Sequence, residues 1–122
     1  MKLKTLLAVF AVAFSVFILT GCAEHPSEVV AQYAAALLEG DVERANSVSA
    51  PELLPVNAKL VTVLKQDSPV VKQIRQNLSA KFNREEIDGD LAFVWSEGNE
   101  SNLITLKKID GKWKVTLERP GK

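Results

Sequence analysis

The sequence predicts an α+β domain in which N-terminal helices pack on a curved antiparallel sheet of three to four strands. Up to Phe82 the apolar side chains recur at helical spacing, and beyond it they alternate with a period of two. The helical segments therefore all precede the extended ones, which is the order expected of helices that cover one face of an antiparallel sheet. A chain of 122 residues has room for one such domain.

The first helix is expected to begin at Pro26 and to end at Gly40. A proline and the acidic Glu28 are typical of a first turn, and glycine is typical of the position after a last turn. Asp41 can then cap a second, short helix that runs to about Val48. The apolar stripe of the first helix consists of Val29, Val30, Tyr33, Ala34, Leu37 and Leu38.

Two further helical segments are expected before the sheet. Pro51 and Pro55 are expected to interrupt the helical pattern, and apolar residues at 60–64 indicate a third helix. Ser68-Pro69 opens a fourth helix. The apolar face expected for that helix consists of Val70, Val71, Ile74, Leu78 and Phe82.

Strands are expected at 91–96, 103–109 and 113–117, where apolar and polar residues alternate. A fourth strand near 84–87 is indicated by the turn residues Asp88-Gly89, which can join it to the next strand as a hairpin. The expected sheet is therefore an antiparallel meander.

The dipeptide Asp110-Gly111 sets the expected register of the last two strands. As a two-residue hairpin loop it makes Lys108 face Trp113, and the pairs that follow along the strands are Leu106 with Val115 and Ile104 with Leu117. The inner face expected for this hairpin consists of Ile104, Leu106, Trp113, Val115 and Leu117.

The loop before this hairpin decides which face of the 91–96 strand is buried. A four-residue loop at 98–101 places Trp95 opposite Ile104 and Phe93 opposite Leu106. Both aromatic side chains are then expected on the inner face.

Residues 1–21 have the organisation of an export signal. Lys2 and Lys4 form a basic start, and the apolar run at 6–19 is shorter than the roughly 20 residues that a membrane-spanning helix needs. Leu19-Thr20-Gly21-Cys22 follows at once and resembles the bacterial lipobox. A permanent membrane-spanning anchor with an incidental cysteine is the alternative.

The lipobox resemblance implies a specific modification of Cys22, the only cysteine in the chain. Its thiol receives a diacylglycerol, the Gly21–Cys22 bond is cut, and the new amino terminus is acylated. Residues 22–26 then form a short lipidated tether and 27–119 a single domain. Because residue 23 is alanine rather than aspartate, the resemblance implies a protein anchored in the cell membrane and, in a Gram-negative bacterium, on the periplasmic side of the outer membrane.

Charge excludes one class of partner. Removal of Lys2 and Lys4 with the signal leaves 13 basic against 15 acidic residues. A mature chain that is slightly acidic has no electrostatic attraction for nucleic acid, so the expected partners are the membrane, through the anchor, and an envelope protein or a small apolar ligand.

Two motifs carry a further resemblance. Residues 26–30 leading to Ala36-Leu37-Leu38-Glu39-Gly40-Asp41, together with Asp110-Gly111-Lys112-Trp113-Lys114-Val115, are similar to the nuclear-transport-factor-two-like superfamily, and most of all to small lipoproteins with a cystatin-like domain of unknown function. The resemblance implies a cone in which a curved sheet cradles the long first helix, with a cavity between them.

Tyr33, Phe93, Trp95 and Trp113 are the candidates for lining such a cavity, and plain core packing is the alternative for all four. The only histidine, His25, lies beside the anchor, and no nucleophile, phosphate loop or metal-ligand spacing is present. The sequence therefore predicts no catalytic residue, no metal and no cofactor.

A membrane-anchored, non-catalytic binding or interaction module of the cell envelope is the expected function. Two alternatives stay open. One is a carrier or sensor of a small apolar ligand, and the other is an enzyme of the ketosteroid-isomerase type, for which buried acidic side chains beside Tyr33 would be needed.

Replacing Cys22 tests the anchor. Cys22→Ser removes the sulfur that accepts the diacylglycerol, so the variant is expected to take up no lipid label and to persist as an uncleaved or mislocalised precursor. Metabolic labelling with a lipid precursor, together with membrane fractionation, measures both effects. A mature-sized variant in the membrane fraction would contradict the lipoprotein interpretation.

Overall fold

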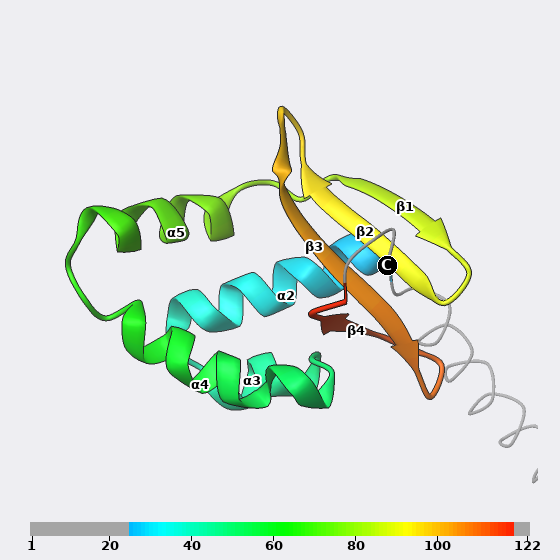
Figure 1. The fold of residues 1–122 in the computed structure, drawn as a ribbon, viewed down its shortest axis with the longest axis horizontal. Coiled ribbons are helices and arrows are strands. Elements are labelled where there is room, and N and C mark those ends of the chain that lie inside the picture. Colours follow the sequence, from blue (N-terminus) through cyan, green and yellow to red (C-terminus); the bar gives the residue numbers. More distant parts are fainter. Residues whose placement is uncertain (1–24, 119–122) are drawn as a thin grey trace, which may run out of the picture.

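The computed structural model describes residues 25–118, which form an α+β fold of four α-helices packed with one four-stranded antiparallel sheet (Figure 1). The export signal expected at 1–21, the cleavage site expected at Gly21 and the lipidation expected at Cys22 all lie outside the described residues. In chain order the elements are α2 (Pro26–Glu39), α3 (Val42–Ser47), the 3-10 helix η1 (Pro51–Leu53), α4 (Leu54–Val63), α5 (Pro69–Ser79), β1 (Arg84–Asp88), β2 (Leu91–Ser96), β3 (Asn99–Ile109) and β4 (Lys112–Thr116).

Helix α2 begins and ends where the sequence predicted. The backbone N–H of His25 donates to Glu28 Oε1 at 3.3 Å, which satisfies the residue before the helix. Gly40 ends the helix with a φ of 78°, a conformation that glycine adopts without the steric cost of a Cβ. Asp41 caps α3 as predicted, because its carboxylate accepts the backbone N–H of Arg44 at 3.2 Å.

The helical pattern is interrupted at 48–50, directly before Pro51, as expected. Pro51 and Pro55 lie in the first turns of η1 and α4, where the N–H that proline lacks has no helical partner. One expectation about the later helices is wrong. Val70 is 68% exposed, because α5 buries the neighbouring Val71 instead. The start of α5 at Ser68-Pro69 is confirmed, and the Ser68 hydroxyl caps the helix by accepting the backbone N–H of Val71 at 3.2 Å.

The sheet has the order β1-β2-β3-β4, and each strand pairs with the next in the chain. The predicted register of the last hairpin is confirmed, since Lys108 pairs with Trp113 and Leu106 with Val115. Leu117 is a correction: β4 ends at Thr116, and Leu117 is 56% exposed rather than part of the inner face.

The buried face of β2 is the opposite of the expected one. Ala92 and Val94 are fully buried on the inner face, the side of the sheet that α2 covers, and Phe93 and Trp95 lie on the outer face. The loop between β2 and β3 has two residues, because Ser96 pairs with Asn99. The register then shifts between Ser96 and Trp95, so Trp95 pairs with Leu103 instead of Ile104. A change of one residue in register moves every side chain of a strand to the other face.

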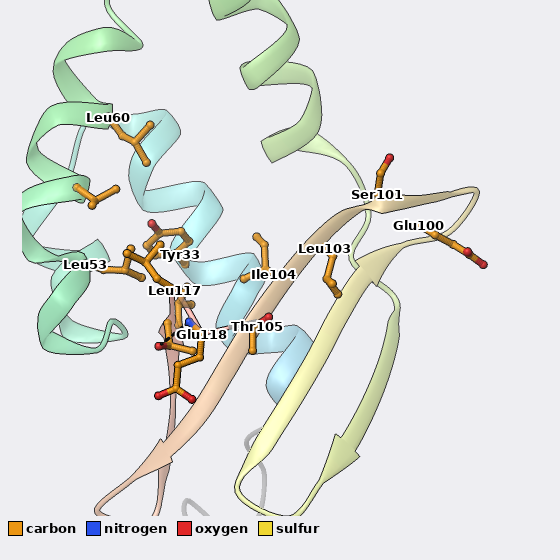
Figure 2. A pocket seen from close by; sticks show the side chains of 13 residues that line it. Tyr33, Leu53, Leu60, Glu100, Ser101, Leu103, Ile104, Thr105, Leu117 and Glu118 are labelled. Carbon is orange, nitrogen blue, oxygen red and sulfur yellow. Dashed lines mark hydrogen bonds between the residues drawn. The ribbon is translucent and has the colours of Figure 1, made fainter. Parts of the chain in front are cut away.

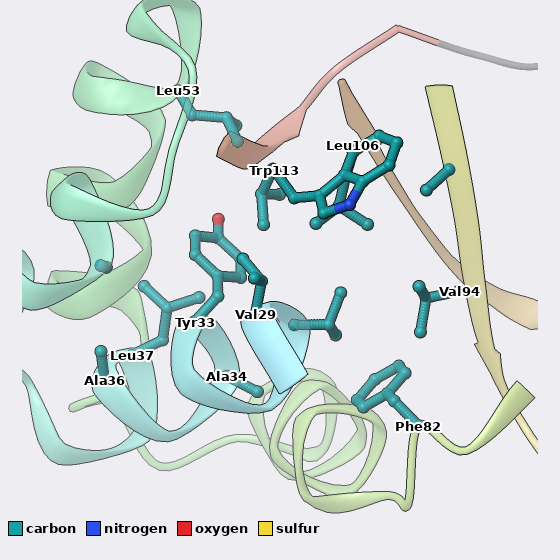
Figure 3. Close-up of a cluster of buried hydrophobic side chains, with 14 of the residues drawn as sticks. Val29, Tyr33, Ala34, Ala36, Leu37, Leu53, Phe82, Val94, Leu106 and Trp113 are labelled. Carbon is teal, nitrogen blue, oxygen red and sulfur yellow. The ribbon is translucent and has the colours of Figure 1, made fainter. Parts of the chain in front are cut away.

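The core lies between α2 and the inner face of the sheet. Helix α2 runs between α5 and the α3–α4 pair, and its residues Val29 and Leu37 belong to the same buried cluster as Leu106 and Trp113 of the sheet (Figures 1 and 3). Trp113 is 7% exposed, and its indole is covered on one side by Lys108 Nζ at 5.0 Å from the ring centroid. Of the helices in residues 25–118, none is long and apolar enough to cross a membrane.

Trp113→Ala is expected to lower the free energy of unfolding by about 3 to 5 kcal/mol, since it empties the largest volume on the inner face of β4. Lys112→Ala, on the exposed face of the same strand, is the matched control and is expected to change it by less than about 0.5 kcal/mol. Urea denaturation measures both. Equal losses would contradict the register of the β3–β4 hairpin.

Candidate functional site

A cleft of about 360 Å³ lies between α2, the η1–α4 segment and the edge of β3; we call it the Tyr33 cleft (Figure 2). Its walls are mostly apolar, which is typical of a binding site. The lining consists of Tyr33, Leu53, Val56, Leu60, Glu100, Ser101, Leu103, Ile104, Thr105, Val115, Thr116, Leu117 and Glu118.

The cleft exists because β3 is longer than its partner β4. Strand β3 has 11 residues and β4 has five, and the register pairs only 105–109 of β3 with β4. Of residues 99–104, Asn99, Leu103 and Ile104 pair with β2, and 100–102 form a bulge between them; among the described residues no strand pairs with the other side of this stretch. We call this stretch the free edge of β3.

The alternation of the β-ladder decides which backbone groups point to the free edge. Ile109 and Lys112 flank the two-residue turn and therefore form a hydrogen-bonded pair. Because hydrogen-bonded pairs recur at every second residue, the odd-numbered residues 105, 107 and 109 of β3 direct their N–H and C=O toward β4. Even-numbered residues bond β2 and the turn before it, as the 2.8 Å bond from the Lys108 N–H to the Asp90 carbonyl indicates. The backbone groups of Leu103 consequently point to the open side, and the bulge at 100–102 interrupts the alternation before it.

Tyr33 forms the floor of the cleft, and its hydroxyl is engaged in a buried polar network. It donates to Oδ1 of Asn57 at 2.7 Å, and Asn57 is 0% exposed. The Asn57 amide in turn donates to Ser49 Oγ at 3.0 Å and to Asn46 Oδ1 at 2.9 Å. Both ends of the buried amide are therefore satisfied, and the network joins α2, α3 and α4.

This network makes the Tyr33 hydroxyl a poor catalyst at neutral pH. Burial raises the pKa of Tyr33 to about 12, so the phenol neither ionises nor gives up its proton readily. The partner it contacts is an amide, which does not titrate, rather than a carboxylate or an imidazole. The Tyr33 hydroxyl is therefore a polar group held in one orientation among apolar side chains.

Charged side chains gather at the end of the cleft where β4 stops. Lys107 Nζ lies 2.9 Å from Glu118 Oε2 and 3.7 Å from Glu52 Oε2, and the Thr116 hydroxyl donates to Glu52. That hydroxyl, more than the lysine, lowers the pKa of Glu52. The hydrogen bond to Glu118 raises the pKa of Lys107. These pairs hold the η1 segment against the last strand.

The structure does not bring the four predicted cavity residues together. Tyr33 lines the cleft and belongs to the same buried cluster as Trp113, whereas Phe93 and Trp95 lie on the outer face of β2. The guanidinium of Arg84 lies 5.5 Å from the centroid of the Trp95 ring. The aromatic cluster expected from the sequence therefore divides into two groups, one in the core and one on the outer face of β2.

Sequence reasoning missed Asn57 and the free edge of β3. A signal for Asn57 was available, because it shares a helical face with Leu53, Leu60 and Leu64 and is the only polar residue at that spacing. The only sequence feature that indicated the free edge of β3 was that the extended segment before Asp110-Gly111 is longer than the one after it.

A second hollow of about 570 Å³ lies between α5 and the β2–β3 turn and is rich in amide side chains, among them Gln73, Gln76, Asn77, Asn83 and Asn102. It contains no aromatic side chain and is more open than the Tyr33 cleft. Within residues 25–118 no group of His, Cys, Asp and Glu side chains could hold a metal ion. His25 Nδ1 lies 3.8 Å from Glu85 Oε2, at the start of α2 and away from the cleft.

A comparison of the chain with protein-family models, curated proteins and solved structures found no match.

The titration of Tyr33 reports on its burial, because it is the only tyrosine in the chain. In the folded protein the phenolate is expected to form with a midpoint near pH 12, against about 10 after unfolding. Since the folded pKa is the higher one, the stability contributed by the neutral phenol is complete below pH 10 and is lost between pH 10 and 12, by about 2 to 3 kcal/mol.

Ultraviolet absorbance of the phenolate measures the midpoint, and denaturation at several pH values measures the loss. Tyr33→Phe is the control, since it cannot ionise and is expected to lose less stability over the same interval as the other groups titrate. A midpoint near 10 in the folded protein would mean that Tyr33 is exposed.

Proposed function

We propose that this protein is a lipid-anchored, non-catalytic binding module of the cell envelope, and that the Tyr33 cleft is its binding site. The observation that carries the proposal is the pairing of an apolar cleft with a Tyr33 hydroxyl already bonded to Asn57. Such a site can fix the position of a ligand but has no acid, base or nucleophile on its floor with which to transform it.

The anchor is the part of the proposal that rests on sequence alone. The lipobox resemblance at 19–22 supports a lipid on Cys22, and α2 begins at Pro26, four residues later. A tether this short holds the domain close to the bilayer surface. Three acyl chains exceed the two that stable anchoring requires. In a Gram-negative cell the cleft would then face the periplasm from the outer membrane.

A second candidate function is the carriage or sensing of a small apolar ligand. Its support is the cleft volume of about 360 Å³, which lies at the lower end of the range of roughly 300 to 1,000 Å³ for small-molecule sites. An isomerase-type enzyme has less support, because it needs a carboxylate beside Tyr33 and that position is occupied by Asn57.

Photo-crosslinking in intact cells tests the site. A benzophenone amino acid at Leu117, which lines the cleft and is 56% exposed, is expected to give discrete adducts with the bound molecule. The matched control is Val70 on α5, which is 68% exposed and does not line the cleft. Adducts are identified by mass spectrometry. Equal labelling from both positions, or none from Leu117, would contradict binding in the Tyr33 cleft.

A further inference from the structure

We propose that the hollow between α5 and the β2–β3 turn binds a neutral, hydroxyl-rich ligand of the oligosaccharide class. We call this site the amide hollow. Its volume of about 570 Å³ falls within the range of roughly 300 to 1,000 Å³ for small-molecule sites. The inference goes beyond the proposed function, because the amide hollow and the Tyr33 cleft share no lining residue among those described.

The walls of the amide hollow are mostly neutral and polar, and they come from one continuous stretch of the chain. Helix α5 contributes Gln73, Gln76 and Asn77, and their spacing of three and four residues places them on one helical face. Facing them are residues of the β2–β3 turn, which lies at the opposite end of the sheet from the β3–β4 hairpin (Figure 1). The described lining consists of Gln73, Gln76, Asn77, Ala80, Lys81, Asn83, Ser96, Glu97, Gly98, Asn99 and Asn102.

The inner face of the sheet changes from apolar to polar where it borders the hollow. Farther along the strands this face carries aliphatic side chains such as Val94 and Ile104. At the bulge formed by 100–102 the regular ladder ends, and Asn102 Nδ2 lies 3.3 Å from Ser96 Oγ. Bulges are over-represented next to active sites, where they redirect a side chain.

Hydrogen bonds within the walls fix which atoms the amides present to a ligand. Asn102 Nδ2 donates to the Asn77 carbonyl at 3.0 Å as well as to Ser96 Oγ, which uses both of its N–H groups and leaves Oδ1 to accept. Asn77 Oδ1 accepts from Gln73 Nε2 at 3.2 Å, so the Asn77 Nδ2 is left to donate. Two neighbouring residues of the hollow therefore present one acceptor and one donor.

This combination of donors and acceptors selects for hydroxyl groups. A hydroxyl both donates and accepts, so it can bond an amide oxygen and an amide N–H at once. A phosphate or a carboxylate only accepts, and an ammonium group only donates. The two charged lining residues leave this preference unchanged, because Lys81 and Glu97 have opposite charges and Glu97 Oε1 already accepts from Asn83 Nδ2 at 3.0 Å.

An oligosaccharide fits these walls better than a peptide. A peptide backbone also donates and accepts, but its side chains need pockets of their own, and Ala80 is the only apolar side chain among the described lining residues. The same residues include no aromatic ring on which a sugar could stack. Hydrogen bonds then supply the affinity, and a dissociation constant on the order of 1 mM is expected.

The test is a titration of the whole protein, as cells produce it, in a zwitterionic detergent without sugar headgroups. The probes are maltotetraose, which carries hydroxyls alone, and chitotetraose, which adds acetamido groups. At least one of them is expected to shift the side-chain amide NMR signals of Gln76, Asn77 and Asn102 with a midpoint on the order of 1 mM. The signal of Gln32, an exposed amide on α2 outside the hollow, is expected not to move.

Two alanine variants test the amides themselves. Gln76→Ala and Asn77→Ala each remove hydrogen-bonding atoms from the hollow and are expected to weaken binding about threefold to tenfold. Alanine is the best helix former, and the Asn77 carbonyl that Asn102 bonds is backbone, so both variants keep α5. Gln32→Ala is the matched control and is expected to change binding less than about twofold.

Three results would overturn the inference. They are the absence of shifts at the hollow amides with both oligosaccharides up to about 20 mM, unchanged binding by both Gln76→Ala and Asn77→Ala, and equal shifts from an acetylated, amidated glycine-serine peptide. The crosslinking experiment at Leu117 probes the other site, so its failure would remove the proposed role of the Tyr33 cleft and leave the amide hollow standing.

Discussion

The register of the β3–β4 hairpin determines the core, the cleft and the free edge together. Asp110 and Gly111 adopt φ values of 53° and 79°, the conformation of a two-residue turn that matches the twist of the flanking strands. This turn aligns Leu106 with Val115 and thereby builds the inner face on which α2 packs. The same alignment leaves the first six residues of β3 beyond the end of β4. One local conformation therefore determines both the buried inner face of this hairpin and the length of β3 that β4 leaves unpaired.

The helical side of the cleft depends on Asn57. A fully buried amide is costly to place in a core unless all its hydrogen bonds are made, and Asn57 makes them with Tyr33, Ser49 and Asn46. Because these partners come from α2, from α3 and from the residues that follow it, the amide fixes how those elements lie relative to α4. A buried group of this kind specifies one arrangement of the helices where an aliphatic side chain would tolerate several. It also keeps the phenol in a fixed orientation at the floor of the cleft.

The edges of the sheet are protected to different degrees. Strand β1 carries charged residues on nearly every position, and charge is a common protection of an edge strand against unwanted pairing. The edge of β4 is partly covered, since the Val115 N–H donates to the Val48 carbonyl and its own carbonyl accepts the Ala50 N–H, at 2.8 and 2.7 Å. The free edge of β3 has neither protection among the described residues, and it lies against an apolar cleft.

The sequence by itself determined the order of the elements, the ends of the first two helices and the register of the last hairpin. Each of these depends on neighbours in the chain: Gly40 and Asp41 act on the turn beside them, and Asp110-Gly111 acts on the two strands that it joins. Tertiary structure decided the rest. Strand β2 has apolar residues on both faces, so the turn after Ser96 and the packing of α2 against Ala92 and Val94 decided that Phe93 and Trp95 lie outside. The Tyr33 cleft likewise needs residues far apart in the chain, from α2, α4 and β3, and no local pattern encodes where such segments meet.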